Sequence, residues 1–276
     1  MDGEVLDRVT PRVKAVRALA GRSVRERAGR FVVEGPQAVR EAVAADSPAR
    51  VRALYATTDA ADRHAEIVAA ARAVGADVQL TSDEVLAGMS LDAQGLLAVA
   101  DLLDGSLGRV LGSGPRLVAL LARVRDPGNA GTVIRAADAA GAGGVVLSAQ
   151  SVDVHNPKVV RSTAGSLFHL PVAFGVDLAA GVAALRASGL AVLAADGAGE
   201  HDLDDLLDVA GSAPAGVPDL ARPTAWLFGN EAWGLPDEDR ALADAAVRVP
   251  LRGRAESLNL ATAATVCLYA SSRAQR

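Results

Sequence analysis

The sequence is poor in the residues on which several common protein chemistries depend. It contains one cysteine, Cys267, among 276 residues, which excludes an internal disulfide framework and a metal site built from a cysteine cluster. No apolar stretch approaches the roughly 20 residues needed to cross a bilayer. The N-terminal MDGEVLDRVTPRVK lacks the apolar core of a secretory signal. We therefore expect a cytoplasmic protein that has no membrane partner and needs no metal.

Positive charge is scarce overall and unevenly distributed. The net charge of −5 argues against a protein that coats nucleic acid nonspecifically. Residues 1–30 nevertheless carry eight basic groups against four acidic ones, whereas DGAGEHDLDDLLD at 196–208 is acidic. An RNA or DNA partner would therefore contact a local patch, and its candidate residues are Arg22, Arg25 and Arg27. A solvated, Arg-rich helix explains the same pattern.

Aromatic residues make up only 3% of the chain but hydrophobic residues make up 50%, so Ala, Val and Leu must build the core. The glycine-rich LLDGSLGRVLGSGPR divides two regions in which strand and helix patterns alternate. We expect a small α/β/α domain at 1–105, a linker at 106–115 and a second α/β domain at 116–276. Strands of the second domain read as continuous Val/Leu/Ala runs, which is typical of a parallel sheet buried on both faces.

Three polar clusters follow apolar strands of the second domain, where ligands bind in open parallel sheets. The first is the turn DPGN, which delivers an asparagine to a helix N-terminus where it can cap free amides, with an arginine six residues later. The second follows LFG in LFGNEAWGLP, and the third is ESLN after VPLRGRA. The candidate polar residues are Asn129, Arg135, Glu231, Ser257 and Asn259. Taken singly, Ser257 is explained as a helix N-cap, and packing is the preferred explanation of Arg135.

The sequence argues against a metal site, a GxSxG hydrolase and a nucleotide-binding site. The four histidines show neither metal-ligand spacing nor a GxSxG partner. GAGG at 141–144 follows a predicted helix and precedes a strand, which is the reverse of the order that a dinucleotide site needs. There is also no Walker A lysine, so the sequence argues against a nucleotide-binding enzyme of Rossmann type.

Three segments together resemble the signature motifs of one family. NAGTVIRAADAAGAGGVVL, LFGNEAWGLP and VRVPLRGRAESLNLATAATVCLY are similar to those of the SpoU (TrmH-type) RNA ribose 2′-O-methyltransferases, in the SPOUT class. KVVRSTAGSLFHLPV resembles a further segment of that family, and the resemblance spans roughly 115–276. Residues 10–105, with FVVEGPQAVREA and GLLAVA, more loosely resemble the ribosomal-protein-like RNA-binding domain that often precedes it.

The resemblance implies a C-terminal parallel-sheet domain with a trefoil knot that binds S-adenosylmethionine. It places the cofactor against Leu227, Phe228, Gly229, Val249, Pro250 and Leu258. It places Asn129, Arg135, Glu231, Ser257 and Asn259 around the reacting ribose. It also implies a homodimer, for which the last helix offers the face Leu258, Ala261, Thr262, Thr265, Leu268 and Tyr269, although packing within one chain explains that face as well.

The implied function is S-adenosylmethionine-dependent methylation of an RNA ribose 2′-hydroxyl. The fused N-terminal domain favours large-subunit ribosomal RNA over transfer RNA as the substrate. A catalytically inactive, ribosome-associated RNA-binding protein is the alternative from another class, and cofactor binding distinguishes the two.

Overall fold

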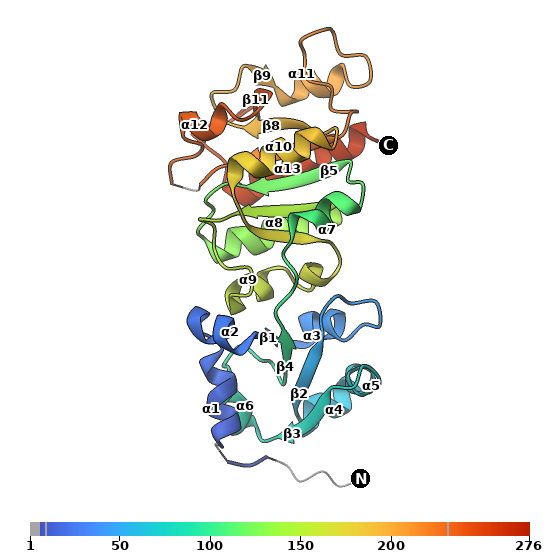
Figure 1. Cartoon of the computed structure of the whole chain (residues 1–276), viewed down its shortest axis with the longest axis vertical. Helices are drawn as coiled ribbons and strands as arrows, with labels where there is room; N and C mark the ends of the chain where they lie inside the picture. The colour runs from blue at the N-terminus through green and yellow to red at the C-terminus, as the bar shows by residue number, and fades with distance from the viewer. Residues whose placement is uncertain (1–5, 9, 231) are drawn as a thin grey trace. The chain divides into compact units, whose positions relative to one another are not determined.

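The computed structural model describes residues 6–8, 10–230 and 232–276, and these form two compact units (Figure 1). The first unit contains the described residues up to Asp104 together with Asp153–His169. The second contains Gly105–Val152 and Leu170–Arg276. No described helix is long and apolar enough to cross a membrane.

The first unit is built on a mixed sheet with the strand order β1-β4-β2-β3. Strand β4 pairs antiparallel with both β1 and β2, whereas β2 and β3 are parallel. The strands are β1 (Arg30–Glu34), β2 (Val51–Thr57), β3 (Asp77–Thr81) and β4 (Leu96–Asp101). The helices are α1 (Pro11–Ala18), α2 (Arg22–Ala28), α3 (Pro36–Ala42), α4 (Thr58–Arg63), α5 (Ala65–Ala73), α6 (Asp83–Met89), α9 (Pro157–Ser162) and the 3-10 turn η1 (Ser166–Phe168).

The second unit is built on a parallel sheet with the strand order β7-β6-β5-β10-β8-β11-β9. The strands are β5 (Leu117–Leu121), β6 (Gly144–Ser148), β7 (Val172–Val176), β8 (Ala191–Ala195), β9 (His201–Asp202), β10 (Thr224–Phe228) and β11 (Ala245–Arg248). The helices are α7 (Leu107–Gly112), α8 (Pro127–Ala139), α10 (Leu178–Ala187), α11 (Leu203–Asp208), α12 (Asp237–Arg240) and α13 (Leu260–Ala274). The predicted parallel sheet is thus confirmed.

Helices cover both faces of this sheet (Figure 1). Alternate residues of a strand point to opposite faces, so Leu227 joins the core under α7 and α10, whereas Trp226 lies on the α13 side. The Trp226 indole Nε1 donates a hydrogen bond of 2.9 Å to Ser271 Oγ on α13. Burial also raises the pKa of Cys267, on the same helix, to about 12, so this thiol is a core residue rather than a nucleophile.

Two segments differ from the sequence-based expectation. The glycine-rich stretch expected as a linker contains α7, because Leu107, Val110 and Leu111 pack their apolar side chains on the core of the second unit. The segment 153–169, expected within the second domain, packs with the first unit. Its Arg161 forms an ion pair with the buried Glu34 of β1, and its Asp153 pairs with Arg25 of α2.

Candidate functional site

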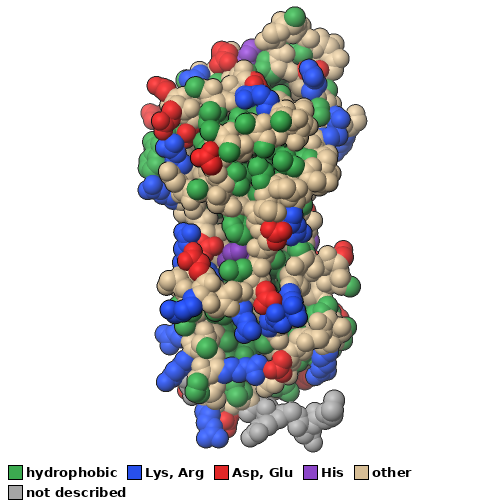
Figure 2. Space-filling model, viewed as in Figure 1, with side chains coloured by type: hydrophobic (Ala, Val, Ile, Leu, Met, Phe, Trp, Pro, Cys, Tyr) green, Lys and Arg blue, Asp and Glu red, His purple; other side chains and the backbone are tan. Residues whose placement is uncertain are grey.

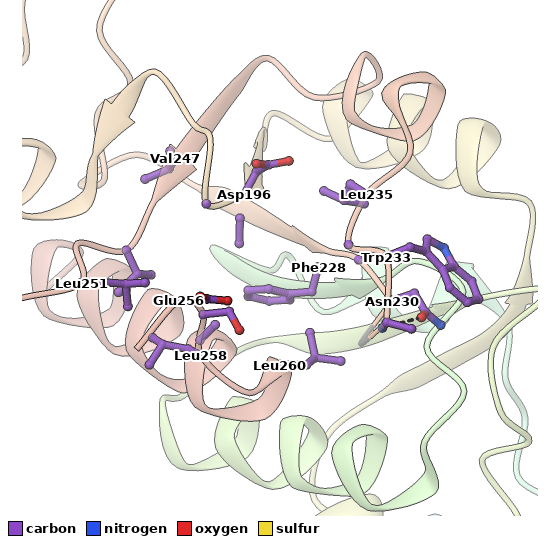
Figure 3. Close-up of a pocket in the computed structure, with 18 residues that line it drawn as sticks. Asp196, Phe228, Asn230, Trp233, Leu235, Val247, Leu251, Glu256, Leu258 and Leu260 are labelled. Atoms are coloured by element: carbon purple, nitrogen blue, oxygen red, sulfur yellow. Dashed lines mark hydrogen bonds between the residues drawn. The ribbon is translucent and has the colours of Figure 1, made fainter. Parts of the chain in front are cut away.

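A cavity of about 430 Å³ lies where β8, β10 and β11 end (Figure 3). Its position agrees with the rule that ligands bind beyond the carboxyl ends of parallel strands. Figure 3 shows the Phe228 ring in the middle of the site, with Glu256 and Leu258 on one side and Leu235 on the other. The cavity is lined by Ala195, Asp196, Gly197, Phe228, Gly229, Asn230, Ala232, Trp233, Gly234, Leu235, Val247, Val249, Leu251, Glu256, Ser257, Leu258, Leu260 and Ala263.

The loop after β10 is closed on itself by hydrogen bonds of Asn230. Backbone N–H groups of Asn230 and Gly234 donate to each other's carbonyl oxygens at 2.9 Å. The Asn230 side-chain Oδ1 accepts from Ala232 N at 2.8 Å. Asn230 is only 6% exposed, so this amide builds the wall of the site rather than offering free polar groups at its rim.

The same loop is fastened to the turn after β5. Asn230 Nδ2 donates to the carbonyl oxygen of Arg123 at 2.8 Å, and Ala122 N donates to Phe228 O at the same distance. The Arg123 guanidinium in turn pairs with Glu238 at 3.0 Å and with Asp239 at 2.9 Å, both on α12. These contacts join the LFGNEAWGLP segment to the residues that directly precede the DPGN turn.

Arg123 is held in a backbone conformation that L residues rarely adopt, with φ at 57°. Its partner Asp239 is 4% exposed, and burial raises the pKa of that carboxyl although the Arg123 charge opposes the shift. Strained backbone and a buried carboxylate persist where surrounding structure compensates for them, often at functional sites. We therefore assign this ion pair to holding the loop rather than to contacting a ligand.

Gly229 has no space for a side chain. A Cβ atom there would lie 2.3 Å from the carbonyl carbon of Gly234 and 2.6 Å from the Leu235 nitrogen. Because these are backbone atoms, no side-chain rotation relieves the clash. The chain therefore needs glycine at this point for the loop to fold back against β10.

Two carboxylates face the cavity. Asp196 follows β8 directly, and its side chain also accepts a hydrogen bond of 2.8 Å from Ala198 N. Glu256 lies in the exposed loop between β11 and α13. Apolar surface from Phe228 and Leu258 lies next to Glu256 (Figure 3). The cavity can therefore hold a flat apolar group together with hydroxyl donors or a positive charge.

The asparagines of the first and third motifs meet outside the cavity lining. Asn259 Nδ2 donates to Asn129 Oδ1 at 3.0 Å. Asn259 also caps α13, because its Oδ1 accepts from Ala261 N at 2.9 Å. The expected capping roles are thus corrected. Asp126, not Asn129, caps α8, and α13 begins at Leu260, so Ser257 is a cavity residue.

The remaining predicted site residues separate into three groups. Phe228, Gly229, Val249, Ser257 and Leu258 line the cavity. Leu227 is instead buried in the core, because its side chain points away from the face that holds Phe228, and Pro250 is not among the described lining residues. Arg135 is exposed on α8 and also lies outside that lining. Glu231 falls outside the described residues.

The basic candidates on α2 also differ from one another. Arg22 and Arg27 are exposed, and Arg22 pairs with Glu26 at 2.8 Å. Arg25 is 2% exposed, donates to the carbonyl oxygens of Leu19 and Ala20, and pairs with Asp153 at 2.5 Å. Burial raises the pKa of Asp153, but hydrogen bonds from His155 and Arg25 outweigh it and hold that pKa well below its usual range. Arg25 is therefore a structural residue, which corrects its assignment to an RNA surface.

Sequence reasoning missed several lining residues. Asp196 comes directly after the strand LAVLAA, so the strand-end rule applied to the other clusters would have found it. Leu251 and Leu260 carry no polar signal, and only the folded loops bring them to the cavity. Among the described residues, no cluster of three or more His, Cys, Asp or Glu side chains could hold a metal ion.

Comparisons with known proteins agree with this geometry. The SpoU rRNA Methylase family matches residues 116–269, and an MRM3-like substrate binding domain matches residues 10–98. A 23S rRNA (uridine(2479)-2′-O)-methyltransferase of Streptomyces viridochromogenes is 34% identical over 261 residues, which are 92% of this chain and 86% of that protein. A tRNA (guanosine(18)-2′-O)-methyltransferase of Thermus thermophilus is 34% identical over 161 residues, 58% of this chain and 75% of its own.

A solved structure extends the likeness to both units. The AdoMet-bound rRNA methyltransferase from Sinorhizobium meliloti has a TM-score of 0.80, 31% identity and 98% coverage of either chain. The matched family covers more than half of the chain and contains all three motif segments that build the cavity and its supports. The chain belongs to the SpoU rRNA methylase family.

Proposed function

We propose that this protein transfers a methyl group from S-adenosylmethionine to a ribose 2′-hydroxyl of RNA, most favourably in large-subunit ribosomal RNA. The main observation behind this proposal is the strand-end cavity, which the motif segments of the family form around Phe228 and Gly229. The Streptomyces relative, a 23S rRNA 2′-O-methyltransferase, supports the ribosomal substrate over nearly the whole chain. The tRNA enzyme from Thermus, which matches 58% of this chain, keeps transfer RNA as the second candidate.

The cavity fits the proposed cofactor in size and chemistry. Its volume of about 430 Å³ lies in the ordinary range of small-molecule sites. Phe228 and Leu258 offer apolar surface for an adenine, and Asp196 and Glu256 can accept from ribose hydroxyls or face a cationic group. S-adenosylmethionine supplies a methyl group on a positively charged sulfur, so a metal is not needed to activate it.

The chain's own residues then have to place the ribose and manage its proton. In the transfer, a bond would form between the 2′-oxygen and the methyl carbon as the bond from that carbon to sulfur breaks, and neutral S-adenosylhomocysteine would leave. The hydroxyl proton would pass to water, and negative charge would develop on the oxygen as that proton departs. An arginine stays protonated at neutral pH, so we assign Arg135 to stabilising this oxygen or clamping the adjacent phosphate. Ser257 at the cavity is assigned to orienting the ribose, and the Asn259–Asn129 hydrogen bond to fixing the loop that carries it.

Mapping ribose methylation tests the function directly. Total RNA from cells with and without the gene should differ at a single 2′-O-methylated nucleotide, and its location distinguishes ribosomal from transfer RNA. Calorimetry on the purified full chain should show S-adenosylmethionine binding. Binding of RNA without any cofactor binding would instead support the inactive, ribosome-associated alternative. The trefoil knot and the cytoplasmic location belong to the same proposal.

We also propose that the first unit supplies most of the RNA affinity. The match to a substrate binding domain at residues 10–98 supports this assignment. Exposed cations lie on its first two helices, namely Lys14, Arg17, Arg22 and Arg27. Figure 2 shows several Lys and Arg side chains on the part of the surface that α1 and α2 form.

Charge reversal on α2 should weaken RNA binding. The double variant Arg22→Glu and Arg27→Glu is expected to lower the affinity for RNA about 10-fold or more. The slope of log affinity against log salt concentration should become shallower by about one for each lost phosphate contact. Filter binding across a range of salt concentrations measures both. The matched control reverses Arg63 and Arg72, exposed cations on α4 and α5 of the same unit. Equal losses in the two variants would contradict a contact specific to α2.

The chain is further proposed to form a homodimer through α13. The predicted face needs correction, because Ala261 and Leu268 are buried within the chain. The apolar side chains that α13 leaves exposed are Val266, at 39%, and Tyr269, at 48%. Tyr269 also donates a 3.3 Å hydrogen bond to Ala139 O at the end of α8, so the two helices form one surface.

Sedimentation should therefore give twice the 28.0 kDa chain mass at low micromolar concentration. A charged side chain cannot be desolvated at an apolar interface without loss, so Val266→Asp with Tyr269→Asp should shift the protein to a monomer. Val74→Asp, at an exposed apolar position on the first unit, is the control and should leave the mass unchanged. A monomeric wild-type protein would refute this assembly.

A further inference from the structure

Trp233 is an aromatic side chain that the fold leaves in solvent. The chain has two Trp, two Tyr and four Phe residues, and most of the large ones are buried in its cores. Trp226, seven residues earlier, is fully buried on β10, whereas Trp233 is 52% exposed. Leaving a large ring in water is unfavourable. An exposed tryptophan beside a functional cavity therefore indicates a contact that forms with a ligand.

The position of Trp233 is fixed by its surroundings. It lines the mouth of the cavity on the loop that Asn230 and Gly234 close. Figure 3 shows its indole on the far side of Asn230 from Phe228, so Asn230 separates the ring from the apolar centre of the site and the ring lies at the outer edge of the cavity. The Arg125 guanidinium carbon lies over the ring, 5.3 Å from its centroid, and this cation–π contact holds the indole in place.

Arg125 places a positive charge beside the Trp233 indole. It directly precedes Asp126, which caps α8 and begins the DPGN turn, whereas Trp233 belongs to the LFGNEAWGLP segment. The two residues thus form a flat, cationic surface at the mouth of the cavity. Single-stranded nucleic acid is commonly bound in this way, by stacking of a base on an aromatic ring beside an arginine.

We propose that Trp233 and Arg125 form a stacking platform for one unpaired base of the RNA substrate, next to the ribose that is methylated. This inference rests on the proposed function and deepens it. Stacking on a ring accepts every base because each has a π face. The platform accordingly orients the reacting nucleotide without selecting its base, and Arg125 attracts the adjacent phosphate. Such a contact requires a target in a loop, bulge or unpaired strand.

Three substitutions at position 233 separate stacking from packing. Trp233→Phe keeps a ring, Trp233→Leu keeps apolar volume without a ring, and Trp233→Ala removes both. Loss of base–aromatic stacking should raise the KM for RNA about 10-fold in the Leu and Ala variants, with Phe close to wild type. Affinity for S-adenosylmethionine should change much less than the KM for RNA, because Asn230 closes the loop and lies between the indole and Phe228, and the melting temperature should stay near wild type in all three.

Fluorescence gives a readout that a structural role would not move. Trp226 is buried and hydrogen-bonded to Ser271, so single-stranded RNA should quench mainly Trp233. Quenching should be strong in the wild-type protein and weak in Trp233→Phe, in which Trp226 remains.

Several outcomes would overturn the platform and leave the proposed function intact. They are an unchanged KM for RNA in Trp233→Ala, loss of cofactor affinity in Trp233→Leu, or conversion of Trp233→Ala from dimer to monomer. The last would place the ring in an interface between copies of this chain. Absence of methylation by the wild-type protein on any RNA, with cofactor binding also absent, would reject the proposed function itself.

Discussion

Gly229→Ala is expected to weaken S-adenosylmethionine binding strongly while most of the fold survives. The added Cβ would lie 2.3 Å from the Gly234 carbonyl carbon and 2.4 Å from its oxygen, so the loop has to move away from β10. Overpacking of this kind costs about 1–3 kcal/mol or more, which corresponds to roughly 10- to 100-fold or more in Kd. Calorimetry with the cofactor measures the loss, and circular dichroism reports whether the protein stays folded.

Gly253→Ala is the matched control for this prediction. Gly253 lies in the neighbouring loop between β11 and α13, and a Cβ there meets no atom within 4 Å. Its affinity for S-adenosylmethionine should equal that of the wild type. Normal cofactor binding by a folded Gly229→Ala protein would show that the loop after β10 is not part of the cofactor site.

The strand-end residues show how much the sequence alone could predict. An apolar run that ends in a polar cluster predicted a ligand site after LFG, because parallel strands open their ligand sites at one end, whereas Phe228 and Gly229 themselves were implied by the family resemblance. The same rule reaches Asp196 after β8. Local patterns thus predict which ends face the site. The alternation of side chains along a strand also predicts that Leu227 and Phe228 point to opposite faces, but which of the two faces the site depends on the tertiary packing of the sheet.

Contacts between residues far apart in the chain account for the errors. Arg22 and Arg25 look alike in the sequence, yet Arg25 is buried because Asp153, 128 residues later, packs against its helix. Asn129 and Asn259 pair across 130 residues, a contact that no local periodicity encodes. The N-cap of α13 is Asn259 rather than Ser257, because the Asn259 side-chain oxygen accepts hydrogen bonds from the backbone amides of Ala261 and Thr262. Tertiary neighbours decided the first two cases, and local capping geometry decided the third.

Arg135→Ala is expected to reduce methyl transfer about 10²–10³-fold, which is the scale for losing one donor that stabilises a developing oxyanion. Affinity for S-adenosylmethionine should change little, because Arg135 is not among the described residues that line the cavity. Stability should change by no more than about 0.5 kcal/mol, since the side chain is exposed on α8. Arg135→Lys keeps the charge but loses the planar guanidinium, so it should restore little activity. Single-turnover methylation, cofactor calorimetry and melting temperature measure the three quantities.

Mixed dimers show which cavity Arg135 serves. Arg135 lies one helical turn from Ala139, whose carbonyl oxygen accepts the hydrogen bond of Tyr269 on the proposed dimer surface. Arg135 therefore lies near that surface and outside the cavity of its own chain. If it acts on the partner's cavity, mixing Arg135→Ala with Gly229→Ala protomers should restore turnover, because one intact cavity then faces one intact arginine. If it acts within its own chain, the mixture should stay inactive. Full turnover in the Arg135→Ala protein alone would remove this residue from the mechanism.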